Sequence, residues 1–247
     1  VSRLAAIEGL ADLTMTTNAH ALGRLAAPLA EAGLRRVNIS IDSLKADRFA
    51  QLTGGGSLAK VLRGIHAARH AGLRPIRLNA VMLRGVNEDE IMDLVRFVEQ
   101  HPESLELRFI EYMPFEVRAH QCVTGARVRQ VISQERALEP SLEDGSASGP
   151  ATNWHCRETK LHVGFITPLS NNFCARCNRL RLQASGHLRT CLAHEDTPSL
   201  RDLLRSGATD THLSAAIRQM VLGKQEGHAC TVEGGVPFEG TMTGIGG

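Results

Sequence analysis

Three cysteines in the second half of the chain have a spacing typical of metal ligands. Cys174 and Cys177 form a C-x2-C pair, and Cys191 completes a C-x2-C-x13-C pattern. The two cysteines of such a turn can bind one metal ion or cluster with little strain. A hairpin predicted around Ser185 and Gly186 returns Cys191 to a position roughly opposite Cys177. The three thiolates are therefore expected to converge on one site.

Two metal chemistries suit three thiolates. Zinc would need a fourth ligand, which His187 or His194 could supply. An iron–sulfur cube held by three cysteines would instead leave one iron open to a substrate. The spacing alone leaves both open, and ordinary core cysteines are a third alternative. The remaining cysteines are scattered along the chain, at Cys122, Cys156 and Cys230. This distribution indicates a reducing compartment rather than a disulfide scaffold.

Arginines surround the cysteine cluster, at positions 176, 179, 181 and 189. Side chains two apart in a strand share a face, so Arg179 and Arg181 are expected to project together while Leu180 and Leu182 face the core. Paired guanidinium groups suit phosphate recognition, although a solvated basic strand is the alternative. Beside three thiolates, the pair favours an anionic ligand held against the metal.

The elements that must position these residues follow an alternating pattern in the first half of the chain. Strands are predicted at residues 13–17, 37–41, 76–83 and 105–111, with helices at 19–32, 45–52, 58–71 and 88–100. This order predicts βαβ units and a parallel sheet, whose carboxyl ends face the ligand. Periodicity does not decide whether the sheet closes into a barrel. The polar strand ends carry the candidate rim residues Thr16, Thr17, Asn18, Ser40, Asp42, Glu111 and Met113.

The pattern changes near residue 138. Residues 139–152 are rich in Pro, Ser, Gly and acidic residues and indicate a linker. A strand at 161–167, a hairpin at 180–192 and a helix at 213–222 are predicted beyond it, followed by a glycine-rich tail. We therefore expect two domains, at residues 1–137 and 138–247.

Composition narrows the functional classes. The 247 residues are 43% hydrophobic and 22% charged, with a formal net charge of +2. That balance gives no case for bulk nucleic-acid binding, and no apolar run approaches the ~20 residues that span a bilayer. No charged-then-apolar leader opens the chain, so the cytoplasm is the expected location.

Six motifs in chain order resemble one family. They are T-T-N at 16–18, N-I-S-I-D-S-L at 38–44, N-A-V-M-L-R-G-V-N at 79–87, R-F-I-E-Y-M-P at 108–114, the cysteine motif N-N-F-C-A-R-C-N-R-L-R-L…G-H-L-R-T-C-L at 171–192, and I-G-G at 245–247. Together they resemble the GTP 3′,8-cyclases, also called molybdenum cofactor biosynthesis protein A, which are radical S-adenosylmethionine (SAM) enzymes.

The resemblance implies an α/β fold: a partial radical-SAM-type (β/α) barrel missing its first strands, plus a C-terminal iron–sulfur domain. It implies that the open iron of a [4Fe–4S] cluster contacts the guanine of GTP. The residue roles that it implies are cluster ligation by Cys174, Cys177 and Cys191, GTP contact by Thr16, Arg77, Arg179, Leu180 and Arg181, and SAM contact by Ser40 and Met113. The resemblance also places the tail residues Gly246 and Gly247 in the active site. The sequence departs from the family at Arg77, usually Lys, and at Ala19, usually Gly.

The family also carries a C-x3-C-x2-C motif near its N-terminus, whose second cluster cleaves SAM. No such motif occurs in these 247 residues, nor does the G-G-E-P segment that follows it. We therefore expect an N-terminally truncated cyclase that does not cleave SAM alone.

For the full-length enzyme, the resemblance implies conversion of GTP to (8S)-3′,8-cyclo-7,8-dihydroguanosine 5′-triphosphate. A homodimer would pass this product to the next molybdopterin-pathway enzyme. The rival interpretations are a peptide-modifying radical SAM enzyme and a noncatalytic GTP- or zinc-binding module.

Overall fold

A computed structural model of the chain describes residues 1–113, 121–141, 149–192 and 199–227. Its contacts divide the chain into two compact units. The first comprises Val1–Tyr112 with Gln121–Thr167, and the second comprises Met113–His120 with Pro168–Gly247. Each unit is described by itself below.

A seven-stranded sheet forms the centre of the first unit, in the order β1-β2-β3-β4-β7-β6-β5. The parallel strands are β1 (Thr14–Thr17), β2 (Arg36–Ser40), β3 (Ile76–Met82), β4 (Leu105–Glu111) and β7 (Leu161–Ile166). At one edge, β6 (Ala151–Cys156) pairs antiparallel with β7, and β5 (Glu139–Pro140) pairs antiparallel with β6. Within the described residues the sheet is open, which agrees with a partial barrel.

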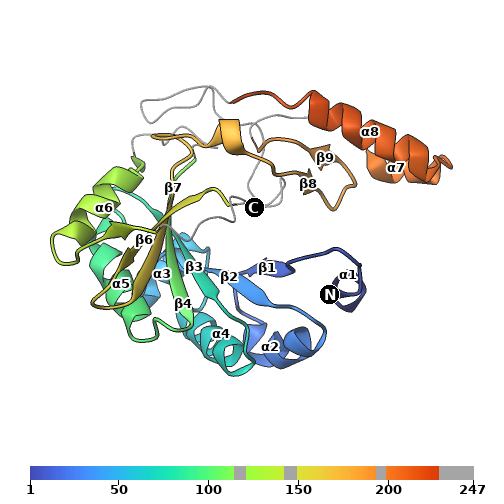
Figure 1. The fold of residues 1–247 in the computed structure, drawn as a ribbon. Helices are drawn as coiled ribbons and strands as arrows, with labels where there is room; N and C mark the ends of the chain where they lie inside the picture. The colour runs from blue at the N-terminus through green and yellow to red at the C-terminus, as the bar shows by residue number, and fades with distance from the viewer. Residues whose placement is uncertain (114–120, 142–148, 193–198, 228–247) are drawn as a thin grey trace. The chain divides into compact units, whose positions relative to one another are not determined.

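Helices cover one face of this sheet. They are α2 (Leu22–Glu31), α3 (Ala46–Leu52), α4 (Leu58–His70), α5 (Ile91–Glu99) and α6 (Gly125–Ser133); the unit also contains the short α1 (Ser2–Ala5) and the 3-10 helix η1 (Glu88–Glu90). Figure 1 shows α2, α4, α5 and α6 on the same side of the strands. The predicted alternation of strands and helices, and with it the α/β class, is confirmed.

The core lies between the sheet and these helices. In β3 and β4 every second residue is buried, as expected when one face of a strand packs against helices. The packed face includes Ile39, Leu78, Leu107 and Phe109, and the Phe109 ring stacks on Phe165 of β7 with centroids 6.2 Å apart. The opposite face of the sheet is therefore left for other groups.

The sheet continues beyond residue 137. The segment predicted as a linker contains β5 and the start of β6, and β7 hydrogen-bonds to β4. The Ser, Gly and Pro residues of this segment are typical of a linker. Its strands form because they pair with a partner distant in the chain, which local composition does not predict. The contact division accordingly falls after Thr167 rather than at 137/138.

An ion pair joins the end of α5 to the segment that follows α6. Arg136 donates from Nε to Glu99 Oε1 at 2.7 Å and from Nη2 to Glu99 Oε2 at 3.0 Å. The Glu99 side chain is only 12% exposed. The hydrogen bonds from Arg136 hold the pKa of this carboxyl below its ordinary value, although burial opposes them. The charged form is therefore favoured in the folded chain.

We expect Glu99→Gln to lower the free energy of unfolding by about 1.5–3 kcal/mol near neutral pH. A lowered folded pKa gives stability that is present above the unfolded pKa and is lost as the pH falls. The difference between variant and wild type should therefore shrink as the pH falls below the ordinary value of 4.5. Urea unfolding at a series of pH values measures this. Glu103→Gln, at an exposed carboxylate 3.4 Å from Arg69, is the control and should change little.

The second unit is smaller. It contains the 3-10 helix η3 (Cys174–Arg176), the hairpin of β8 (Arg181–Leu182) and β9 (Leu188–Arg189), and the helices α7 (Leu200–Arg205) and α8 (Asp210–Leu222). Leu188, Leu200 and Met220 form its buried cluster. The predicted hairpin is confirmed, and Gly186 adopts the positive φ of +89° that its turn requires. None of the helices in the described residues is long and apolar enough to cross a bilayer.

Candidate functional site

Two rows of polar residues cross the face of the sheet opposite the helices. Residues paired across adjacent strands share a face, so each row follows directly from the strand register. The first row is Thr16, Asn38, Arg77 and Glu106. The second row is Ser40, Asn79, Arg108, Gly164 and Asn153. The face not used for the core is therefore equipped to bind a polar ligand.

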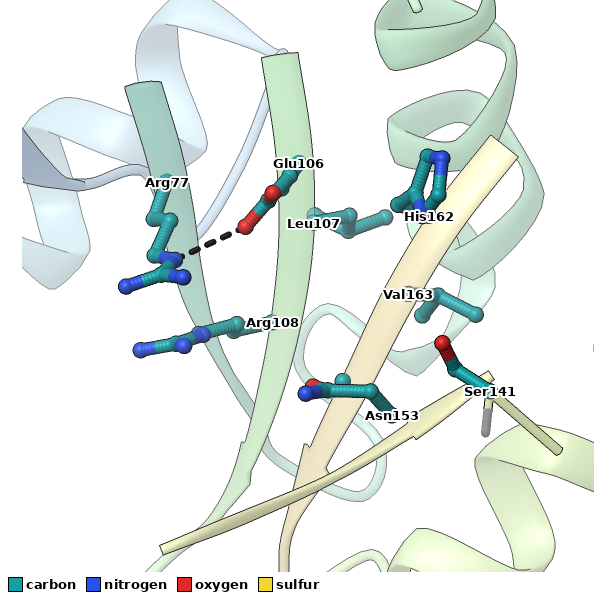
Figure 2. Close-up of a pocket in the computed structure, with 9 residues that line it drawn as sticks. Arg77, Glu106, Leu107, Arg108, Ser141, Asn153, His162 and Val163 are labelled. Carbon is teal, nitrogen blue, oxygen red and sulfur yellow. Dashed lines mark hydrogen bonds and ion pairs between the residues drawn. The ribbon is translucent and has the colours of Figure 1, made fainter. Parts of the chain in front are cut away.

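A cavity of about 190 Å³ lies on this face, lined by residues of β3, β4, β6 and β7. Figure 2 shows the guanidinium groups of Arg77 and Arg108 reaching to the same side of β3 and β4. Arg77 donates from Nε to Glu106 Oε2 at 2.7 Å, which fixes the direction of its guanidinium. Two guanidinium groups against the single carboxylate of Glu106 leave this cavity net positive, which suits an anionic group.

Gly164 leaves the room that two cavity side chains occupy. A Cβ at this position would stand 2.8 Å from Asn153 Oδ1 and 3.3 Å from Arg108 Cγ. Both distances are shorter than ordinary contacts, so any larger residue would push these side chains away from the strand. The glycine in β7 therefore allows both polar groups to lie over the sheet.

Two buried acceptors on this face lack a donor. Oδ1 of Asn38 and Oδ1 of Asn79 are inaccessible to solvent and accept no hydrogen bond within the described part of the chain. Buried polar atoms are normally hydrogen-bonded, and exceptions call for an explanation. Both oxygens are covered by protein atoms, so a ligand on this face could reach them only if the two amide groups turned.

The predicted rim residues divide into exposed and structural ones. Thr16 and Ser40 are exposed, at or near the carboxyl ends of β1 and β2, and Met113 follows β4 half-buried. Asp42 is half-buried and accepts from Val81 N at 2.8 Å, and desolvation raises the pKa of its carboxyl. Glu111, 2% exposed, accepts from Gly125 N at 2.9 Å at the start of α6. Asp42 and Glu111 therefore support the backbone rather than the rim.

The cysteine turn lies in the second unit. Cys174 and Cys177 flank one 3-10 turn, closed by a hydrogen bond from Cys177 N to Cys174 O at 3.0 Å. Cys174, Cys177 and Cys191 are half-buried thiols. No three His, Cys, Asp or Glu side chains of the described residues form a group that could hold a metal ion as they stand. The donor chemistry of the three thiols nevertheless suits an iron–sulfur cluster or zinc.

Positive charge favours the thiolate of Cys177. Burial alone would raise the pKa of this thiol, but hydrogen bonds from Arg179 and the charges of Arg179 and Lys224 outweigh it and lower the pKa to about 7. Burial and the charge of Arg179 lower the pKa of the Arg181 guanidinium, whereas the nearby Cys191 and Cys177 raise it. The arginines predicted beside the cluster are thus close to its sulfur atoms.

The predicted orientation of the neighbouring leucines is wrong. Leu180 is 43% exposed and Leu182 is 66% exposed, whereas Arg179 and Arg181 are half-buried. The small core of this unit contains Leu188 from β9 instead. With only two paired residues in β8, ordinary strand alternation does not decide which side chains are covered. The Arg179 guanidinium lies over the Phe173 ring, 4.9 Å from its centroid.

One residue of this site, Lys224, could not be predicted from the sequence. Lys224, just after α8, donates from Nζ to Cys177 O at 2.9 Å and to Arg179 O at 3.0 Å, and lies 3.4 Å from Cys177 Sγ. No short motif links a lysine to a cysteine so distant in sequence. Of the other predictions, His187 contacts Ser185 Oγ at 3.0 Å, and His194, Gly246 and Gly247 lie outside the described residues.

Comparisons with known proteins agree along the whole chain. Residues 1–98 match the Radical SAM superfamily model, and residues 105–230 match the model described as Molybdenum Cofactor Synthesis C. The GTP 3′,8-cyclase of Moorella thermoacetica is 44% identical over 250 residues, covering 100% of this chain and 76% of that protein. The GTP 3′,8-cyclase of Pseudomonas putida strain W619 is 44% identical over 252 residues, covering 99% of this chain and 74% of the relative.

A solved structure of a radical SAM methyltransferase from Sphaerobacter thermophilus aligns with 49% of this chain and 36% of that chain. Its TM-score of 0.39 at 14% sequence identity is too low to bear on the fold. The sequence relatives cover both units at high identity. The chain belongs to the GTP 3′,8-cyclase family of radical SAM proteins.

Proposed function

We propose that this chain acts in the radical SAM conversion of GTP to (8S)-3′,8-cyclo-7,8-dihydroguanosine 5′-triphosphate, in molybdenum cofactor biosynthesis. The observation that carries the proposal is the identity of 44% to a named GTP 3′,8-cyclase across the entire chain, which includes the C-x2-C-x13-C cysteines. The cations close to these thiols, Arg179, Arg181 and Lys224, support it, because a triphosphate needs such charges.

In this proposal the second unit holds a [4Fe–4S] cluster through Cys174, Cys177 and Cys191. When bound, the cluster supplies an open iron to which the guanine base can coordinate. Arg179 and Arg181 lie close to the thiols, and we assign them, with Leu180, to GTP. Three cysteine ligands leave the fourth coordination position available, which is the chemistry that substrate binding requires.

The first unit contributes the remaining ligand contacts in this proposal. Thr16 and Arg77 belong to one polar row and are assigned to GTP, and Ser40 and Met113 are assigned to SAM. The guanidinium groups of Arg77 and Arg108, against the single carboxylate of Glu106, support an anionic ligand on this face. We assign Gly246 and Gly247 a role beside the substrate, since glycine allows the closest backbone approach.

Radical generation needs a second cluster in this family. The 247 residues contain no C-x3-C-x2-C, so we propose that the ligands of that cluster are not among them. The chain by itself should then release no 5′-deoxyadenosine from SAM under anaerobic, reducing conditions, and measurable turnover would contradict this. We also propose a cytoplasmic homodimer that passes its product to the next enzyme of the pathway.

The experiment that tests the proposed function is the metal and sulfide content of the chain after anaerobic reconstitution, with and without GTP. About four irons and four sulfides per chain, with a spectrum that GTP perturbs, would support the substrate-binding cluster. One tightly bound zinc without sulfide would instead favour a noncatalytic zinc-binding module and overturn the assignment.

Arg77 provides a test on the sheet. We expect Arg77→Met to raise the Kd for GTP by about 10-fold to 100-fold, because one charge-assisted hydrogen bond contributes about 1.5–3 kcal/mol. Calorimetric titration of the reconstituted chain measures this. Arg77→Lys, which keeps the charge and carries the family's usual residue, is the matched control and should bind within a few-fold of wild type. Equal affinity of the Met variant and wild type would remove Arg77 from the GTP site.

A further inference from the structure

Lys224 joins the end of α8 to the turn that carries two of the three cysteines. It stands two residues beyond Leu222, where the helix ends. Its Nζ donates to the carbonyl oxygens of Cys177 and Arg179, at 2.9 and 3.0 Å, and lies 3.4 Å from Cys177 Sγ. All three acceptors belong to a segment about 45 residues away in the sequence, so these contacts are tertiary.

These contacts use the whole donor capacity of the side chain. An ammonium group has three N–H donors and no acceptor, and here it faces two carbonyl oxygens and one sulfur. The side chain is half-buried, which strengthens charge-assisted bonds relative to an exposed surface. A long, flexible lysine loses rotamer freedom in such an arrangement, so its contacts must offset that loss.

The acceptors identify what the lysine holds. The two carbonyl acceptors, Cys177 O and Arg179 O, stand at the two ends of the short segment that joins the second cysteine of the C-x2-C pair to the first of the two arginines. A cation fixed to both carbonyls sets the backbone that presents the Cys177 sulfur and the Arg179 side chain together. Groups that bond to a ligand's backbone or sulfur orient the ligand and tune the bound metal.

We propose that Lys224 is a positioning residue for the C-terminal cluster: it fixes the Cys177–Arg179 segment through two carbonyl bonds and donates a hydrogen bond to the Cys177 sulfur. This inference rests on the proposed function, since it assumes that the cysteines hold an iron–sulfur cluster. Hydrogen bonds to sulfur and nearby positive charge both stabilise the reduced state of such clusters and raise their potential.

The test compares wild type with Lys224→Met, Lys224→Arg and Arg218→Met in the full 247-residue chain. Methionine keeps the length of the side chain without charge or donors. Arg218 is an exposed cation on α8 and serves as the control for loss of one positive charge from that helix. The readouts are iron and sulfide content, the midpoint potential of the reconstituted cluster, and amide hydrogen exchange of residues 174–179.

For Lys224→Met we expect the affinity of the chain for the cluster to fall by about 10-fold or more, as it does when other groups hydrogen-bonded to a metal ligand are removed. The cluster that still forms should have a lower potential, and residues 174–179 should exchange faster even before reconstitution. Lys224→Arg should restore the potential, and Arg218→Met should match wild type. A Met variant with wild-type content, potential and exchange would overturn the inference while leaving the proposed function intact.

Two further outcomes are distinguishable. A wild-type chain that binds no iron or sulfide would overturn the proposed function and this inference with it. If Lys224→Met loses its helical circular dichroism, Lys224→Gln is measured instead, because it keeps a donor but removes the charge. A potential for that variant equal to wild type would overturn the electrostatic role, and a lower potential would support it.

Discussion

A chain with Cys177→Ser is expected to lose its iron and sulfide after reconstitution, where wild type should retain about four of each. Removing a direct ligand should lower cluster affinity by more than the 10-fold to 100-fold that outer-shell changes cause. Of the proposed ligands, Cys177 has a thiolate that nearby charge favours, because Arg179 and Lys224 outweigh burial and lower its pKa to about 7. Serine keeps the size of the side chain but lacks a thiolate. Iron and sulfide assays on desalted protein measure the effect.

Cys122 and Cys156 offer matched controls in the first unit. Both are free thiols that are 1% exposed. Burial raises the pKa of the Cys122 thiol to about 11, so this cysteine stays neutral and inert near neutral pH. Cys122→Ala and Cys156→Ala should therefore keep full iron and sulfide content. Retention of the cluster in Cys177→Ser together with its loss in a control variant would show that the ligands have been misassigned.

The largest effect on stability is expected at Glu90. Its carboxylate is fully buried and accepts hydrogen bonds from Ser43 Oγ at 2.7 Å, from Leu44 N at 2.7 Å and from Arg48 Nη1 at 2.6 Å. Glu90→Ala would remove one partner and leave the other groups without their acceptor. Breaking a buried charged network in this way costs about 3–5 kcal/mol. Urea unfolding monitored by circular dichroism measures the change.

The neighbouring Asp89 isolates the contribution of burial. It also pairs with Arg48, at 2.6 Å, and with Lys45, at 2.7 Å, but its side chain is 52% exposed. Exposed ion pairs contribute about 1 kcal/mol or less, so Asp89→Ala should lower stability far less than Glu90→Ala. Equal effects at the two positions would contradict the interpretation that burial of the Glu90 network makes it important.

The Glu90 network also bears on the edge of the sheet where we propose that ligands bind. Ser43 and Leu44 lie in the segment that leaves β2, shortly after Ser40, the residue assigned to SAM. Asn87 ties this segment to β3 by donating from Nδ2 to Asp42 O at 2.7 Å and to Val81 O at 2.9 Å. Of the two polar residues predicted from this segment, Ser40 is thus an exposed candidate for ligand contact and Asp42 holds the backbone in place.

The amino-acid sequence by itself determined the repeated units of the fold and the spacing of the three cysteines that form the candidate thiolate site. Strands of alternating or continuous apolar residues and helices of period 3.6 carry local signals, so β1 to β4 and the helices between them could be predicted. The C-x2-C spacing is likewise local, and family motifs spread over the whole chain identified the class of enzyme. The hairpin of β8 and β9 followed from its Ser-Gly turn.

Tertiary structure alone decided what depends on partners distant in the chain. The strands β5 and β6 extend the sheet because β7 pairs with β4. No local sequence pattern predicts that pairing. Asp42 and Glu111 look like rim residues in the sequence, yet each accepts a backbone hydrogen bond from another element. The contacts of Lys224 arise only where α8 ends beside the cysteine turn. The physical reason is that burial and hydrogen-bond pairing are properties of the folded neighbourhood, whereas periodicity, turn chemistry and ligand spacing belong to short segments of chain.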